Sequence, residues 1–232
     1  MFGKPGRRTR AAVGGVAAAS ACVVLAACSP VKLGSAAIVG DQRITTSALD
    51  TQVTNLQAAA KPYGKQISLS AADMPAAVLS WLIRFQVSDQ VAANAGISVT
   101  AAQIQAGTSD INSQAQSVAS QEGLASAQAA LLDAGISPQM LSDLGRYQAQ
   151  ELAFAEQIND GKLPSTTAEG NAVDAKLTKA QCTAAKSLTI QVSPQFGRLN
   201  YSQLSVVPTP NTLSQPPGTP SPADTTGLTP AC

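Results

Sequence analysis

Cys28 is the residue whose chemistry is best defined by its neighbours in this sequence. It closes the run Leu25-Ala26-Ala27-Cys28, in which an apolar residue and two small residues precede a cysteine. This pattern is typical of a bacterial lipobox, where the cysteine sulfur takes a diacylglycerol and the chain is cut just before it. We therefore predict that Cys28 is lipidated and becomes the first residue of the mature chain. Two acyl chains give stable anchoring, at about 0.8 kcal/mol per buried methylene.

Residues 1–27 have the composition of an export signal. A basic start precedes an alanine-rich apolar stretch at 11–27, which is too short and too weakly apolar to be a stable membrane span. The basic residues are Lys4, Arg7, Arg8 and Arg10. We expect 1–27 to be removed, residues 28–34 to act as a spacer, and the lipid to hold the protein on the extracytoplasmic face of the cell membrane.

Two alternatives to this interpretation stay open. Cys28 could be incidental in an ordinary secretory peptide, because the usual cleavage sites are also runs of small residues. The pair Arg7-Arg8 could indicate twin-arginine export, but Thr9 and Arg10 stand where apolar residues normally follow such a pair. Export by the general secretory (Sec) route is therefore favoured.

The sequence contains no histidine. This excludes Ser-His-Asp and Cys-His nucleophilic sites, zinc bound through histidine, and imidazole acid-base chemistry. The acidic residues form no recognisable catalytic pair, and no glycine-rich phosphate loop is present. We expect no enzymatic activity, no metal, no small-molecule substrate, and no cofactor other than the acyl lipid on Cys28.

Composition and charge favour a helical domain. Removing 1–27 takes away four of the fifteen basic residues and none of the fourteen acidic ones, which leaves eleven against fourteen and a formal net charge of −3. Such a chain gives no sign of nucleic-acid binding. Aromatic residues make up only 3% of the sequence, so the core must consist of Ala, Leu, Ile and Val. That composition favours closely packed helices over a sandwich or barrel.

Hydrophobic spacing and capping signals place the elements within one domain at 35–207. A hairpin is expected around Gly40-Asp41 and a helix with the apolar stripe Leu49, Val53, Leu56 and Ala60 after it. Further helices are expected from Ser70 to Gly96, from Thr100 to Gly123, over 126–134, from Ser137-Pro138 to Ile158, and over 167–187. The helix that begins at Thr100 is expected to carry Ile104, Ile111, Ala115 and Val118 on one narrow apolar face. A strand is expected at 188–192, and it should pair with residues 37–40. Residues 208–232 are rich in Pro, Thr and Ser, so we expect them to form a disordered tail.

The order of these segments resembles the SurA-type N-terminal chaperone domain, which also occurs in PrsA-like foldases. The resemblance rests on the run Ala37-Ile38-Val39-Gly40-Asp41, the long helix closed by Gly96-Ile97-Ser98-Val99-Thr100, and Gly135-Ile136-Ser137 before the Leu141 helix. Phe196-Gly197-Arg198 looks like the closing segment of actinobacterial lipoproteins of this type. The parvulin prolyl isomerase domain that relatives often carry has no room between Gly161 and Leu188. The resemblance implies a helical module that holds unfolded or exported polypeptides without isomerase activity.

Larger apolar side chains are the candidates for contact with such clients. For each of them, ordinary core packing at helical spacing is the stronger alternative, and exposure is easiest for Met140 and Tyr147 near the start of their helix. The candidates are Met74, Trp81, Phe85, Met140, Tyr147 and Phe154.

Two cysteines remain after the predicted processing. Cys22 leaves with the signal and Cys28 is lipidated, so Cys182 and Cys232 stay in an oxidising compartment. We expect a disulfide between them that tethers the tail. The alternatives are two unpaired thiols or pairing of Cys232 between chains.

Three classes of function are compatible with these observations. The first is a membrane-anchored holdase for exported proteins, and the second is a structural cell-envelope lipoprotein with one dedicated partner. The third, a solute-binding lipoprotein, is the weakest, because such proteins usually have two α/β lobes with several aromatic residues.

Overall fold

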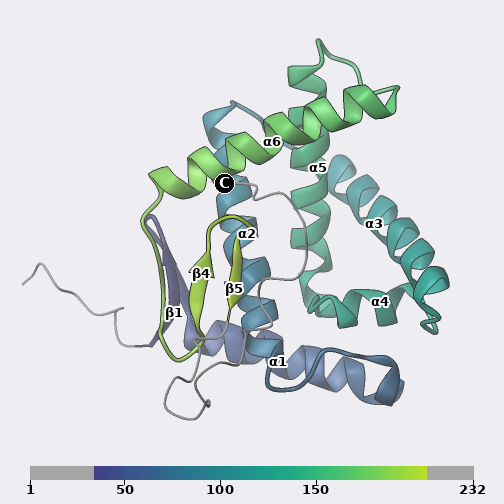
Figure 1. The fold of residues 1–232 in the computed structure, drawn as a ribbon, viewed down its shortest axis with the longest axis vertical. Helices are drawn as coiled ribbons and strands as arrows, with labels where there is room; N and C mark the ends of the chain where they lie inside the picture. The colour runs from purple at the N-terminus through teal and green to yellow at the C-terminus, as the bar shows by residue number, and fades with distance from the viewer. Residues whose placement is uncertain (1–33, 208–232) are drawn as a thin grey trace, which may run out of the picture. The chain divides into compact units, whose positions relative to one another are not determined.

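The computed structural model describes residues 34–207 (Figure 1). Within this range the protein is mainly helical with a small antiparallel sheet, which confirms the expectation of a mainly helical domain with a small strand pairing. The predicted signal, the spacer up to residue 33 and the tail at 208–232 lie outside the described residues.

The chain begins with a hairpin that supplies two of three strands in the first sheet. Strand β1 (Ser35–Val39) pairs with β2 (Gln42–Thr45) across the predicted turn. Gly40 has a φ of +57°, and a side chain there would meet Leu188, so the turn needs a glycine.

The third strand comes from the far end of the domain. Strand β3 (Ile190–Val192) pairs with β1, with Val39 opposite Ile190 and Ala37 opposite Val192. The sheet order is β2-β1-β3. The predicted pairing of 37–40 with 188–192 is therefore confirmed, and it joins the beginning and the end of the helical region.

Six α-helices follow the predicted order. They are α1 (Thr46–Ala60), α2 (Met74–Asn94), α3 (Ala101–Glu122), α4 (Ala127–Asp133), α5 (Leu141–Ile158) and α6 (Thr167–Ser187). The predicted stripe Leu49, Val53, Leu56 and Ala60 is the buried face of α1. The bounds of α6 coincide with the prediction, and a capping box formed by Thr166 and Glu169 begins it. The predicted capping box of Thr100 and Gln103 begins α3.

Three local predictions were wrong. Ser70 does not begin α2 but a preceding turn, where its hydroxyl accepts from the amide of Asp73 at 3.2 Å. Pro138 begins a 3₁₀ turn, η2 (Pro138–Met140), and the buried Ser137 donates its hydroxyl to Gln52 at 2.6 Å instead of capping a helix. Val118 was expected on the inner stripe of α3 and is exposed, while Ala119 is buried there. A second 3₁₀ segment, η1 (Lys61–Gln66), follows α1.

Helices α3 and α5 touch backbone to backbone. A Cβ built on Gly107 would meet the backbone oxygen of Gly145, and one on Gly145 would meet the backbone oxygen of Ile104. Both positions therefore require a residue without a side chain. Serine and glutamine side chains fill much of the exposed face of α3.

A second hairpin, which the sequence analysis did not predict, closes the described chain. Strand β4 (Arg198–Asn200) pairs with β5 (Ser205–Val207). It lies against α2, because the amide of Val206 donates to the hydroxyl of Ser80 at 2.8 Å and Val206 is buried (Figure 1). The turn between β4 and β5 is thereby held beside the middle of α2.

Candidate functional site

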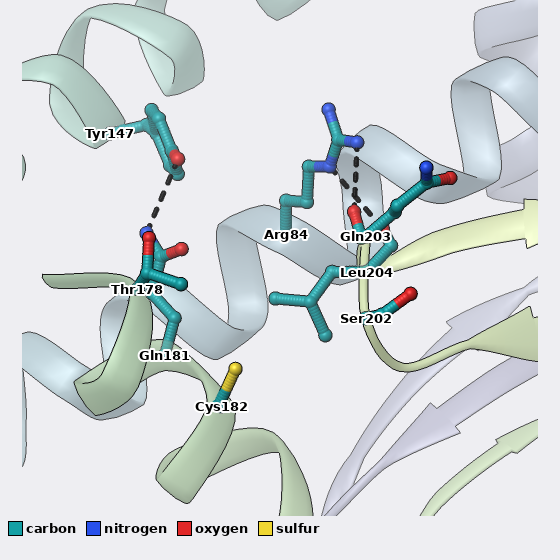
Figure 2. Close-up of a pocket in the computed structure, with 8 residues that line it drawn as sticks. All are labelled: Arg84, Tyr147, Thr178, Gln181, Cys182, Ser202, Gln203 and Leu204. Atoms are coloured by element: carbon teal, nitrogen blue, oxygen red, sulfur yellow. Dashed lines mark hydrogen bonds between the residues drawn. The ribbon is translucent and has the colours of Figure 1, made fainter. Parts of the chain in front are cut away.

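A cavity of about 170 Å³ lies where α2, α5 and α6 meet the β4–β5 turn (Figure 2). Most of its lining side chains are polar, and the turn contributes one wall. The lining residues are Arg84, Tyr147, Thr178, Gln181, Cys182, Ser202, Gln203 and Leu204. We call it the polar cavity after these residues; it offers an occupant hydrogen-bond donors and acceptors together with apolar surface.

Arg84 connects α2 to the turn. Its guanidinium donates to the backbone oxygen of Gln203 at 3.0 Å and to that of Leu204 at 3.3 Å. On its other side it lies 4.8 Å from the ring centre of Trp81, a favourable cation–π distance. Burial lowers the pKa of Arg84, while the charge of Glu151 acts in the opposite direction. Arginine stays charged despite such shifts, so Arg84 brings a fixed positive charge to the cavity.

Glu151 is the acidic counterpart of Arg84 in this region. It lies on α5, one turn after Tyr147, and is half-buried. The amide of Gln181 donates to the carboxylate of Glu151 at 3.2 Å and to the hydroxyl of Tyr147 at 3.3 Å. Burial is the largest cause that raises the pKa of Glu151, and the bonds from Tyr147 and Gln181 partly oppose it.

Tyr147 is held neutral by the same surroundings. Burial raises its pKa well above the ordinary value, and the neighbouring charge of Glu151 raises it further. Its ring also contacts Trp81 edge-on, with ring centres 6.3 Å apart, and lies 6.1 Å from Phe85. Tyr147 thus joins an apolar cluster on one side to the polar network on the other.

A second, wider depression runs between the C-terminal half of α2, the end of α5 and α6. We call it the α6 groove; its volume is about 420 Å³. Its apolar lining includes Val91, Ala95, Phe154, Ala180 and Ala184. Its polar lining is Asn94, Lys176, Lys179, Thr183 and Ser187.

The six candidates for client contact separate by burial. Met74, Phe85 and Met140 are buried with exposures of 6%, 4% and 0%, so core packing accounts for them. The expectation that Met140 would be easily exposed is wrong, because η2 turns it into the core. Trp81 is partly buried, and its indole donates to the backbone oxygen of Ala134 at 2.8 Å.

Tyr147 and Phe154 reach the two depressions. Tyr147 lines the polar cavity, and Phe154 lines the α6 groove. They lie two turns apart on α5. These two are the candidates that the structure places where an occupant could contact them.

Of the three cysteines named as predicted site residues, Cys182 lies within the described residues. Cys182 is buried, lines the polar cavity and is disulfide-bonded. Cys28 and Cys232 lie outside the described residues. The lipid on Cys28 and the identity of the cysteine bound to Cys182 remain predictions.

Arg84 and the nearby Glu151 were not identified from the sequence. Arg84 stands among apolar neighbours on α2, Glu151 follows Gln150 on α5, and no motif connects the two residues. Their positions could have identified them, because each is a charged residue that interrupts the apolar face of a helix predicted from the hydrophobic spacing. Their partnership depends on how α2, α5 and α6 pack.

Within residues 34–207, no helix combines the length and apolar character needed to cross a membrane. Nor does any group of three or more His, Cys, Asp or Glu side chains in the same range gather as a metal site requires.

Comparison with known proteins adds no relative. No family model, no curated protein and no solved structure matches this chain.

Proposed function

We propose that this protein is a membrane-anchored, extracytoplasmic holdase whose helical domain is of the SurA N-terminal type. The α6 groove carries the proposal, and its occupant is an extended segment of an unfolded, exported polypeptide. The predicted lipobox at Cys28 and the resemblance over residues 35–200 support the location and the family.

The chemistry of the groove suits an unfolded segment. Its floor is made of small apolar side chains with one aromatic ring, Phe154, which can contact many apolar side chains without selecting one. Lys176 and Lys179 are exposed at its edge and complement acidic side chains of a client. Weak and adaptable contacts of this kind serve many partners.

Blocking the groove tests the proposal. Thr183 is exposed, lines the groove and donates its hydroxyl to the backbone oxygen of Lys179. The mature protein should slow aggregation of several unrelated unfolded exported proteins at near-stoichiometric ratios, and Thr183→Trp should lose most of this activity. Light scattering during dilution of the client from denaturant measures it.

A matched control separates blocking from a general effect of a surface tryptophan. Ser113 on α3 is also exposed and donates to the backbone oxygen four residues earlier. Ser113→Trp should hold clients as well as the wild type does. Equal activity of both variants would contradict the groove as the client site.

A dedicated structural lipoprotein is the second candidate function. The low aromatic content of the chain favours it, because a general holdase usually presents more large apolar side chains. Failure of correctly folded protein to protect any unrelated client, together with recovery of one envelope protein in a pull-down, would favour this candidate.

The absence of isomerase activity is a separate prediction. With no histidine and no room for a parvulin domain, the mature protein should not accelerate cis/trans isomerisation of an X-Pro peptide, which takes tens to hundreds of seconds uncatalysed. A protease-coupled peptide assay measures it, and a clear acceleration would overturn the assignment as a non-enzyme.

A further inference from the structure

We propose that the polar cavity is a binding site for an extended, proline-rich segment, and that its occupant is residues 208–232 of this chain. This surface is distinct from the α6 groove, and the inference does not depend on the holdase function. It rests on where the two ends of that segment are attached and on the chemistry of the cavity lining.

The first attachment is the β4–β5 hairpin. Residue 208 follows directly on β5, and the turn preceding β5 supplies Ser202, Gln203 and Leu204 to the cavity wall. Burial of Val206 and its bond to Ser80 fix the hairpin on α2. The segment therefore starts within one strand length of the cavity.

The second attachment is Cys182, on the opposite wall. Its sulfur is disulfide-bonded, and the residue lines the cavity (Figure 2). The other cysteines of the sequence are Cys22, Cys28 and Cys232. Because the first belongs to the predicted signal and the second to the predicted lipid anchor, Cys232 is the partner that the mature chain offers. A Cys182–Cys232 bond brings the end of the segment to the cavity mouth.

The lining matches the backbone of such a segment. Residues 208–232 include seven prolines among twenty-five residues. A proline-rich backbone favours the extended polyproline II conformation, in which the carbonyl oxygens have no partner within the chain. The cavity presents donors to such oxygens from Arg84 and Thr178, whereas Gln181 and Ser202 already donate to other residues of the domain. Among the described residues, Arg84 uses only two of its five guanidinium N–H groups.

Charge is complementary as well. The segment contains one acidic residue, Asp224, and no basic residue. Arg84 is the charged residue among those that line the cavity, and the neighbouring Glu151 is not part of the lining. The carboxylate of Asp224 can therefore pair with Arg84 when the segment occupies the cavity.

Amide hydrogen exchange on the full mature chain tests the inference, after peptide mapping under non-reducing conditions. Mapping should recover Cys182 joined to Cys232. In Cys232→Ser, exchange should rise several-fold in the 201–204 turn and in the 208–232 segment, with no change in α3. Cys182→Ser should give the same pattern, because either substitution removes the tether.

Three outcomes would overturn the inference. One is a map that joins Cys182 to another cysteine or finds it as a thiol. Another is unchanged exchange in the 201–204 turn of Cys232→Ser, which means that the segment does not cover the cavity. The third is an equal rise in α3, which shows that the disulfide only stabilises the domain as a whole.

Discussion

Glu151 is a half-buried carboxylate whose surroundings disfavour its ionised form. Its carboxylate is drawn into the region between α5 and α6, where burial raises its pKa and bonds from Tyr147 and Gln181 only partly compensate. Arg84 acts in the favourable direction through its charge. Since Arg84 is itself partly desolvated, the pair keeps two opposite charges near the cavity at a cost in stability.

Replacing this carboxylate with an amide should stabilise the protein in a pH-dependent way. In wild type, the folded state holds the Glu151 proton more tightly than the unfolded state does. No cost exists below the ordinary pKa near 4.5, where both states are protonated. As pH rises above that value the unfolded state ionises first, so stability falls until the raised folded pKa is passed. Glu151→Gln keeps an acceptor for Gln181 and avoids this loss.

Thermal unfolding from pH 4 to 8 measures the effect. The melting temperature of Glu151→Gln relative to wild type should rise with pH and level off near neutrality. Glu156→Gln on the same helix, where the side chain is exposed, is the matched control and should show little change. A difference that shrinks with rising pH would contradict the assigned cause.

At the scale of elements, helix contacts depend on glycines that the hydrophobic pattern does not reveal. The buried stripe of α3 is interrupted at Gly107, and that of α5 at Gly145. Each glycine lies where the backbone of the other helix passes. The α3–α5 packing therefore depends on the absence of two side chains as much as on the apolar residues around them.

A methyl group at either position should separate the two helices. Gly107→Ala places a Cβ against the backbone oxygen of Gly145, which cannot rotate away, so the loss should be about 1–3 kcal/mol, as in overpacked cores. Gly170→Ala on α6 has open space around the added carbon and should stabilise by roughly 0.5–1 kcal/mol. Urea unfolding midpoints measure both. Equal destabilisation by both substitutions would contradict the assignment of the loss to the close contact at Gly107.

The ends of the helices and some of their buried faces could be predicted from the sequence. Helix ends were predictable because their signals are local: Thr100 with Gln103, and Gly123 after α3, act within a single turn. The inner face of α1 followed from spacing alone. Val118 was misassigned because α3 has few large apolar residues, so their spacing hardly distinguishes one face of the helix from the next.

The cavity could not be predicted in this way. Arg84, Glu151 and Gln181 come from three helices, and their proximity follows from crossing geometry that no local signal encodes. The β4–β5 hairpin was missed because each of its strands has only three residues. So short a hairpin is stable only through its contact with α2, which the local sequence does not reveal.

At the scale of the whole molecule, the pairing of β1 with β3 brings residue 37 next to residue 192. The predicted lipid on Cys28 precedes β1 by only seven residues. If fully extended, this spacer spans at most about 25 Å. The sheet is therefore expected close to the membrane surface.

Removing the predicted anchor should release the protein or leave it unprocessed. Cys28→Ala deletes the sulfur that both lipid transfer and lipoprotein-type cleavage require. In detergent-phase partitioning, the variant should be found in the aqueous phase instead of the detergent phase. Alternatively, immunoblotting should show an uncleaved precursor. An unchanged membrane fraction with mature size would refute the lipobox.

The position of β1 also has a mechanical consequence. If the predicted lipid on Cys28 holds the chain while a bound client is pulled away, the force would enter the described domain at its first residue, Gly34. It passes into β1, the middle strand, whose hydrogen bonds to β2 and β3 must both break before the strand can leave. Under such a force, this small sheet would be loaded before the helices of the core.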